Sequence, residues 1–299
     1  MRSRVGQPKR MRRCTSVEAK QRPRRAAGIK HMDSSPQTAG APGGTLETPR
    51  VGLFVTCLAN LFRPSAALAA VQLLEAAGCA VDAPRAQTCC GQPALNSGDF
   101  DDARGIARRT IEAFERYDYV VAPSGSCIRT LRHDYPDLLA NDPAWRPRAE
   151  RLAARAHELT SFLVDVLGWA GPERAAVPEC TLTYHDTCSG LRGLGIKAQP
   201  RALLARVEGV ALTEMKDAEV CCGFGGTFCV KYPEISTKIV SDKTANVAAS
   251  GATVLAGGDL GCLMNIGGRL KREGSAVRVY HVAEVLAGMN VEPICGEGE

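Results

Sequence analysis

The sequence lacks the long apolar runs and the short motifs that mark several common classes of protein. No window approaches the roughly 18 uninterrupted apolar residues that a membrane-spanning helix needs, and the N-terminal region holds no secretory signal. We therefore expect a cytoplasmic protein with no integral membrane segment. The glycine-rich segment GFGG at 223–226 lacks the Lys-Ser/Thr of a P-loop and does not match GxGxxG. No flavin or nicotinamide motif is present, and no Ser-His-Asp order or carboxylate pair indicates hydrolysis.

Aromatic residues are also scarce, at 5% of the chain, and none lies within residues 1–49. Residues 1–30 hold eleven Lys or Arg against one acid, Glu18, so they carry about +10 and leave the rest of the chain near −5. Residues 1–49 show no hydrophobic periodicity, and we predict a disordered basic tail there. A nucleic-acid arm, a transit peptide or a true start at Met32 are the alternatives. We expect no nucleic-acid partner, because no aromatic residues interleave the basic ones and the remainder is acidic.

Cysteine, by contrast, is abundant, with thirteen in 299 residues. A reducing cytoplasm does not sustain a disulfide framework, and an odd number excludes complete internal pairing. Clustered cysteines in that compartment bind metal or do redox work. The C-x-x-C knuckle typical of structural zinc sites does not occur in the chain.

The cysteines follow one pattern that occurs twice. Each copy has one cysteine, then an adjacent pair followed by glycine, then a last cysteine: Cys57, Cys89, Cys90 and Cys127 in the first copy, and Cys188, Cys221, Cys222 and Cys262 in the second. The first cysteine and the pair are separated by 31 residues in one copy and 32 in the other, and the pair and the last cysteine by 36 and 39. A matched order at matched spacing indicates an internal duplication.

Predicted strands and helices alternate in step with this pattern. We predict helices over 64–78, over 103–114, around 202–207 and after Pro233, and a helix that bridges the copies with Leu152, Leu159, Leu163 and Val166 on one face. The alternation predicts an α/β protein of two tandem βα domains, 50–170 and 171–299, with mostly parallel sheets. Sites in such sheets lie beyond the carboxyl ends of the strands. Because the single cysteines follow predicted strands, we expect the four thiols of each copy to converge.

Two thiols on neighbouring residues suit a ligand that is wider than one ion. In an extended segment their side chains point apart, so both reach one small ion only with a distorted backbone. An iron–sulfur cluster accepts ligands from several directions, and glycines beside the pair would let amide N–H groups approach its sulfurs. Thiolates also bind other soft metals.

The remaining cysteines and histidines have simpler interpretations. We interpret Cys14, Cys79, Cys180 and Cys295 as small buried hydrophobes, and Cys229 as a neighbour of the second pair rather than a ligand. For His185 we favour a structural role, with metal ligation and proton relay as alternatives. His281 is expected to cap or orient a terminal helix. Glu234 and Asp186 read as helix-start and turn residues.

The segments CCGQPALNSG, PSGSC, CCGFGGTF, VKYPEIS and GCLMNIGG carry, in this order, a resemblance to the CCG cysteine-rich domain family over nearly all of 50–287. That family includes the cysteine-rich subunit of heterodisulfide reductase and the iron–sulfur subunit of glycolate oxidase. The resemblance is to its lactate-utilization members. It implies an iron–sulfur electron-transfer subunit of a multi-protein, NAD-independent L-lactate oxidation system, active with a companion ferredoxin-like iron–sulfur subunit and a third lactate-utilization protein rather than alone.

The resemblance also implies that the eight cysteines of the repeated pattern are ligands of one or two [4Fe–4S] clusters. The heterodisulfide reductase relatives end each motif in C-x-x-C, whereas Thr130 and Asn265 stand at those last positions here. The cluster type and number therefore stay open. Two other functions remain alternatives: a heterodisulfide reductase-like thiol/disulfide oxidoreductase, and a non-catalytic scaffold that holds zinc. No catalytic residue is assigned.

Overall fold

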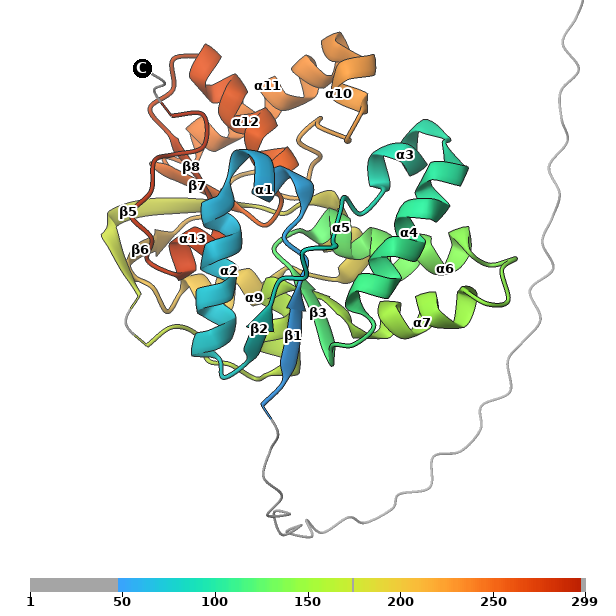
Figure 1. Ribbon diagram of the computed structural model, residues 1–299. Helices are drawn as coiled ribbons and strands as arrows, with labels where there is room; N and C mark the ends of the chain where they lie inside the picture. The colour runs from blue at the N-terminus through green and yellow to red at the C-terminus, as the bar shows by residue number, and fades with distance from the viewer. Residues whose placement is uncertain (1–47, 174, 297–299) are drawn as a thin grey trace, which may run out of the picture. The chain divides into compact units, whose positions relative to one another are not determined.

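A computed structural model describes residues 48–173 and 175–296, and the predicted tail over 1–49 lies outside them except for its last two residues. Two four-stranded sheets organise the described residues, one in each half of the chain (Figure 1). All strand pairs in both sheets are parallel. The α/β class and the parallel sheets predicted from the sequence are confirmed. Among the described residues, no helix is both long and apolar enough to cross a membrane.

The first half contains four strands and the helices that connect them. The elements are β1 (Arg50–Leu53), α1 (Cys57–Phe62), α2 (Pro64–Ala76), β2 (Ala80–Asp82), α3 (Gln92–Ser97), α4 (Phe100–Phe114), β3 (Tyr119–Ala122), α5 (Gly125–Arg129), the π-helical turn η1 (Thr130–Asp134), α6 (Tyr135–Leu138), α7 (Arg146–Arg155), β4 (Ala156–Glu158), α8 (Leu159–Ser161) and the π-helical turn η2 (Phe162–Val166).

The second half repeats the strand order with fewer helices. Its elements are β5 (Ala176–His185), the π-helical turn η3 (Ser189–Gly193), α9 (Ala198–Leu204), β6 (Glu208–Leu212), α10 (Phe228–Lys231), α11 (Pro233–Ala249), β7 (Val254–Gly257), α12 (Leu260–Arg272), β8 (Arg278–His281) and α13 (Val282–Leu286). The strand order is β2-β1-β3-β4 in the first sheet and β6-β5-β7-β8 in the second. Equivalent strands therefore occupy equivalent places in the two halves.

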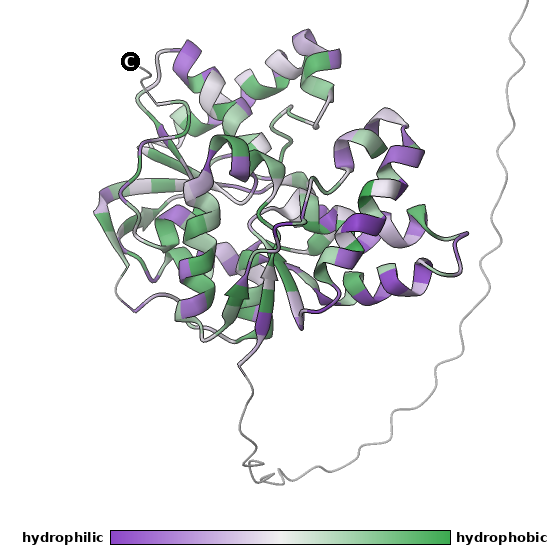
Figure 2. Cartoon of the chain, in the orientation of Figure 1, coloured by the Kyte–Doolittle hydropathy of each residue, from purple (hydrophilic) through white to green (hydrophobic). Residues whose placement is uncertain are grey.

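Three apolar cores alternate with the two sheets. One face of the first sheet packs on α4, α6 and α7, and the other faces a central core that also includes α2, α9 and α13. The second sheet borders the same central core and packs its other face on α11 and α12. Figure 2 shows hydrophobic residues along α2 and the strands, with hydrophilic residues spread over α4 and α7. The halves are thus joined through a shared interior, and the described residues belong to one compact unit.

Several expected helices are confirmed and two need correction. Helices over 64–76 and 100–114 match the predicted segments, and Ala103, Ala107, Ile111 and Phe114 are all buried on one face of α4. The single helix predicted to bridge the halves is wrong. Residues 156–158 form β4, which pairs with β3, so the segment divides into α7, a strand and two short turns. The helix expected around 202–207 begins at Ala198 and ends at Leu204. The domain limits 50–170 and 171–299 stay a prediction.

Polar contacts also tie the halves together at the carboxyl ends of the strands. The Asp259 carboxylate accepts hydrogen bonds from the Ser126 amide at 2.9 Å and from the Ser124 hydroxyl at 3.4 Å. The Glu284 carboxylate pairs with Arg63 at 2.7 and 3.1 Å. Glu284 is 1% exposed, so this ion pair is shielded from water and its partner is needed to offset desolvation.

Glu158, at the end of β4, provides a pH-dependent term in stability. Burial raises the pKa of this carboxyl to about 7, although hydrogen bonds from Thr160 and Ser161 partly oppose the shift. The folded state therefore binds this proton more tightly than the unfolded chain does. The stabilisation that this tighter proton binding provides is fully present below about pH 4.5 and is lost as pH rises through about 7. The free energy of unfolding falls over this range by on the order of 3 kcal/mol.

We expect the urea unfolding midpoint to fall between pH 5 and pH 7.5 by more in the unmodified protein than in Glu158→Gln. The amide of the variant does not titrate, whereas its oxygen keeps the acceptor that Thr160 and Ser161 use. Equal pH dependence in the two proteins would contradict the assignment of this term to Glu158.

Candidate metal centres

The four predicted cysteines of the first half converge beyond the ends of β1 and β3. Cys57 begins α1, Cys89 and Cys90 precede α3, and Cys127 lies in α5. The sulfur atoms of Cys57 and Cys89 are 3.7 Å apart. Cys90 lies close enough to Cys127 and Cys89 that both thiols raise its pKa, together with burial. We call this set the first centre.

The four cysteines of the second half converge in the same way, and we call them the second centre. Cys188 precedes η3, Cys221 and Cys222 lie in the loop before α10, and Cys262 lies in α12. The Cys221 thiol raises the pKa of Cys188, and the Cys222 pKa is raised by Cys221 and Cys262. The convergence predicted from the repeated pattern is therefore what the fold produces in both halves.

A glycine after each pair turns a backbone amide toward sulfur. Gly91 and Gly223 have φ values of 84° and 83°, a conformation that favours glycine. The Gly91 N–H donates to the Cys89 sulfur at 3.5 Å, and the Gly223 N–H donates to the Cys221 sulfur at 3.3 Å. Such N–H···S contacts are among the means by which a protein tunes thiolate-bound metal groups.

These contacts favour one anionic sulfur in each centre. The pKa of Cys89 is strongly lowered, first by its neighbour Cys57, then by Cys90 and the Gly91 amide. Cys221 has a lowered pKa for the equivalent reasons, with Cys188 first. A metal group that displaces the remaining thiol protons would find four sulfur donors already gathered. The donor set therefore fits a soft metal or an iron–sulfur cluster.

Different residues support the pair in the two halves. The Cys90 carbonyl accepts a hydrogen bond from the buried Tyr135 hydroxyl at 2.8 Å, whereas the Cys222 carbonyl accepts one from the Asn265 side chain, also at 2.8 Å. Asn265 lies three residues after Cys262, and its side-chain amide fixes the loop that carries the pair. Thr130, at the equivalent place in the first half, donates to the Ser126 carbonyl of its own helix.

The loop after each pair also contacts the helix that carries the last cysteine. In the first half the Gln92 side chain donates to the Ser126 carbonyl at 3.4 Å. In the second half the Phe224 ring lies over Gly261, where an added Cβ would come within 2.4 Å of the ring. Both contacts connect the residue two after the pair to the residue just before the last cysteine. Sequence reasoning did not identify these residues.

The approach to the first centre includes a strained residue and a cavity. Thr56, directly before Cys57, has φ 67°, which is costly for a β-branched residue, and its hydroxyl caps α1. Gln87 accepts from the Val55 amide and donates to the Leu53 carbonyl, which fixes the loop at the end of β1. A cavity of about 350 Å³ opens here and is lined by Cys57, Cys89 and Arg85, among others.

The two centres lie on turns that meet each other. Gly125, two residues before Cys127, approaches Gly190, two residues after Cys188, so closely that a Cβ on Gly125 would be 3.0 Å from Gly190 backbone atoms. The equivalent pair by repeat position is Ala59 and Leu260, and both are buried in one cluster. The absence of side chains at 125 and 190 is thus required for the contact between the turns.

His185 is a further polar residue at the second centre. It ends β5, is fully buried, and its ring offers a nitrogen within 4.8 Å of the sulfur atoms of Cys222 and Cys262. Neither ring nitrogen has a hydrogen-bond partner among the described residues. Burial, and then the charge of Lys243, lower the pKa of His185 to about 3, whereas Cys221 and the Ala218 carbonyl partly oppose the shift. The contact with the Ala218 carbonyl does not have the geometry of a hydrogen bond. The structural role favoured from the sequence therefore lacks the hydrogen bond it would need.

The other cysteines of the described residues do not belong to either set of four. Cys79 is buried, as expected, and Cys180 is half-buried against the central core. Cys229 lies in α10 and contacts the carbonyl of Gly226 in the preceding loop. The expectation for Cys295 is wrong, because this residue is exposed near the end of the described chain and itself has a left-handed conformation, with φ 59°. Cys14 lies outside the described residues. All twelve cysteines within the described ranges are free thiols.

The remaining predictions for polar residues are confirmed or extended. His281 caps α13 by accepting from the Ala283 amide, and its other nitrogen contacts the Pro123 carbonyl of the first half. Glu234 lies in the first turn of α11. Asp186 is more than a turn residue, because it is 1% exposed and forms a two-pronged ion pair with Arg201 at 2.8 and 2.9 Å.

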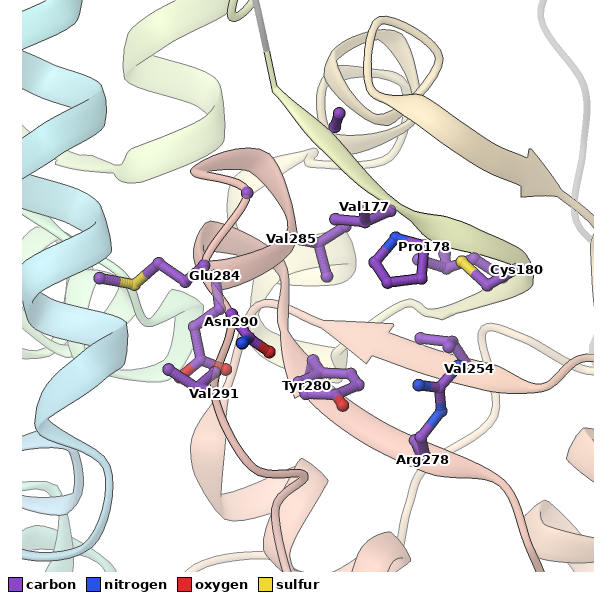
Figure 3. A pocket seen from close by; sticks show the side chains of 14 residues that line it. Val177, Pro178, Cys180, Val254, Arg278, Tyr280, Glu284, Val285, Asn290 and Val291 are labelled. Carbon is purple, nitrogen blue, oxygen red and sulfur yellow. The ribbon is translucent and has the colours of Figure 1, made fainter.

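A separate cavity of about 360 Å³ lies at the other end of the second sheet (Figure 3). It is bordered by the first residues of β5, by Arg278 and Tyr280 of β8, and by the segment after α13. None of the eight cysteines of the two centres lines it. The cavity is therefore not part of either centre.

The fold and the two cysteine sets define a duplicated, cysteine-rich α/β protein. The profile of the CCG family, described as a cysteine-rich domain, matches residues 51–132 and 182–267. The chain belongs to the CCG cysteine-rich domain family, which confirms the resemblance inferred from the sequence.

Curated relatives carry a more particular name. The chain is 49% identical over 245 residues to Lactate utilization protein A of Exiguobacterium sp., covering 80% of this chain and 97% of that protein. It is 48% identical over 237 residues to Lactate utilization protein A of Bacillus subtilis, covering 79% and 98%. A crystal structure of a putative Asp/Glu racemase from Yersinia pestis aligns with 81% of this chain and 96% of its own at 11% identity, but the TM-score of 0.34 supports no argument.

Proposed function

We propose that this chain is an iron–sulfur electron-transfer subunit of a multi-protein system that oxidises L-lactate without NAD, in the cytoplasm. The observation that carries the proposal is the gathering of four thiols at equivalent places in both halves, each with a glycine amide on one sulfur. Lactate is proposed as the substrate of the system because relatives that are 45–49% identical to this chain, over nearly their whole length, are named for lactate utilization. We assign the repeats to 50–170 and 171–299.

The residues of each centre would hold the group and shield it. Cys57, Cys89, Cys90 and Cys127 would bind in the first half, and Cys188, Cys221, Cys222 and Cys262 in the second. Cys90 and Cys222 are 3% and 1% exposed, so water is kept from one side of each centre. The Gly91 and Gly223 amides would stabilise negative charge on sulfur. When bound, an iron–sulfur cluster, here [4Fe–4S], accepts and releases single electrons.

The surroundings support electron exchange with partner proteins. The cavity beside the first centre lets solvent approach Cys57 and Cys89. Leu61 and Phe62, which follow Cys57 in α1, are 69% and 62% exposed. We assign the companion ferredoxin-like subunit and a third lactate-utilization protein as the partners of this complex, with the dehydrogenation chemistry shared among them.

Metal analysis after anaerobic purification tests the proposal. We expect about four irons and a matching amount of acid-labile sulfide per occupied half. Zinc without iron would overturn the proposal and favour a scaffold, a result compatible with the His185, Cys222 and Cys262 group. Reversible oxidation of adjacent thiols in active, metal-free protein would instead favour a thiol/disulfide oxidoreductase.

A further inference from the structure

The two centres differ at one position close to the sulfurs. His185 lies three residues before Cys188, and the residue three before Cys57 is Phe54. His185 is the last residue of β5 and Phe54 directly follows β1, and both side chains are fully buried. Phe54 packs against Phe114 with ring centroids 5.5 Å apart, which is an ordinary core contact. His185 has no such apolar explanation.

An imidazole without partners is costly to bury. Both nitrogens of His185 are shielded from water and unpaired among the described residues. A buried polar group without a hydrogen bond has lost its contacts with water and gained none in exchange, which lowers stability. Substitution by an apolar ring at the same place is compatible with the fold, because the first half has Phe54 there. A bound group that contacts the imidazole would therefore explain why a polar ring is buried at position 185.

The position of the His185 ring indicates which group it binds. His185 pairs with Gly257 in the register of β5 and β7, which brings it beside the turn that leads to Cys262. Its nitrogen and the sulfurs of Cys222 and Cys262 all lie within 4.8 Å of one another, close enough to reach one metal atom. Neutral imidazole is a common ligand for iron and zinc.

We propose that His185 is an additional protein ligand of the second centre, bound to metal through a ring nitrogen. The first centre then has sulfur ligands only, and the second has sulfur and nitrogen. This inference rests on the proposed iron–sulfur function. Because nitrogen ligation raises the reduction potential of iron–sulfur centres relative to sulfur ligation, the second centre is the better electron acceptor of the two.

Selective nitrogen labelling tests this ligation without an activity assay. The full chain is produced with ¹⁵N-histidine and with unlabelled histidine, purified anaerobically and reduced, and its nitrogen couplings are measured by pulsed electron paramagnetic resonance. We expect a strong coupling, typical of a directly bound nitrogen, that changes with the histidine label. The label is placed in the imidazole ring only, so that all backbone amides, including those of Gly91 and Gly223 that contact sulfur, keep ¹⁴N in both samples and their contribution does not change.

Variants assign the coupling to one residue. His185→Phe, which copies the first half, and His185→Gln, which keeps a polar side chain, should both lose the strong coupling. His157→Phe is the matched control, because His157 packs between Tyr119 and Phe162 away from both centres and should keep the coupling. Circular dichroism checks that each variant folds. If His185→Phe does not fold, the coupling in His185→Gln decides whether His185 is the ligand.

The outcomes separate this inference from the proposed function. Iron and sulfide present with only a weak histidine coupling, or none, would overturn ligation by His185 and leave the iron–sulfur function standing. A strong coupling that survives in His185→Gln would also overturn it. Wild-type protein without iron would overturn the proposed function, and with it the ligation of an iron–sulfur cluster by His185.

Discussion

Replacement of Cys222 with serine is expected to remove about half of the iron and sulfide that the chain binds when both halves are occupied. Cys222 is 1% exposed and lies between Cys221, Cys262 and His185. A hydroxyl is a poor ligand for the soft metals that thiolates prefer, so the second centre should empty while the first is retained. Iron and sulfide analysis of anaerobically purified protein measures the loss, and lactate oxidation by the reconstituted complex should fall with it.

Two variants control this experiment. Cys229→Ser removes a nearby thiol whose contact is the Gly226 carbonyl, and it should leave iron, sulfide and activity unchanged. Cys90→Ser should remove the other half of the metal, because it is the equivalent residue of the first centre. Unchanged iron and activity in Cys222→Ser would remove that residue from the ligand set.

Replacement of Gly223 with alanine is expected to damage the same centre through the backbone. A residue with a side chain at φ 83° costs about 1–2 kcal/mol. The new Cβ would also lie 2.8 Å from the Ser236 carbonyl oxygen and 3.3 Å from Ile239. The loop must therefore shift, which disturbs the amide that contacts Cys221. We expect a lower unfolding midpoint and loss of iron from the second centre.

Gly251→Ala separates the conformational cost of a side chain at positive φ from the cost of the clash. Gly251 has φ 70° with no atom within 4 Å of an added Cβ, so it should show the conformational cost alone and keep its iron. Gly91→Ala should be milder than Gly223→Ala, because its Cβ meets the movable Ile106 side chain at 3.2 Å. Equal effects of Gly223→Ala and Gly251→Ala on stability and iron would contradict the proposed clash.

The regular spacing of the cysteines allowed the sequence to predict both centres, because an internal duplication constrains the fold twice. The central strands were also predictable, since Val51 to Leu53 and Val254 to Ala256 are short, buried, apolar runs. The outer strands were not. β2 and β4 have three residues each, and β4 lies within a segment whose leucines repeat with helical spacing. Pairing with β3 determines its conformation, and local sequence does not contain that contact.

The supporting residues of the centres were missed for a related reason. Tyr135 reaches the carbonyl of Cys90 across 45 residues, and Asn265 reaches that of Cys222 across 43. Nothing in the local pattern of either residue indicates its partner. The signal for His185 lies in the comparison of the two copies, because this ionisable residue occupies the repeat position that holds a phenylalanine, Phe54, in the first copy.

The contact between Ser124 and Asp259 has a consequence for how the molecule is assembled. Each residue occupies the N-cap position of the helix that carries the last cysteine of its copy, three positions before that cysteine. Contact between equivalent residues is what an isologous interface produces in a symmetric dimer. The chain therefore holds, within one polypeptide, the arrangement that two identical subunits would form around a two-fold axis. Covalent linkage keeps the two cysteine-bearing turns face to face at any dilution, whereas a dimer of single copies would separate.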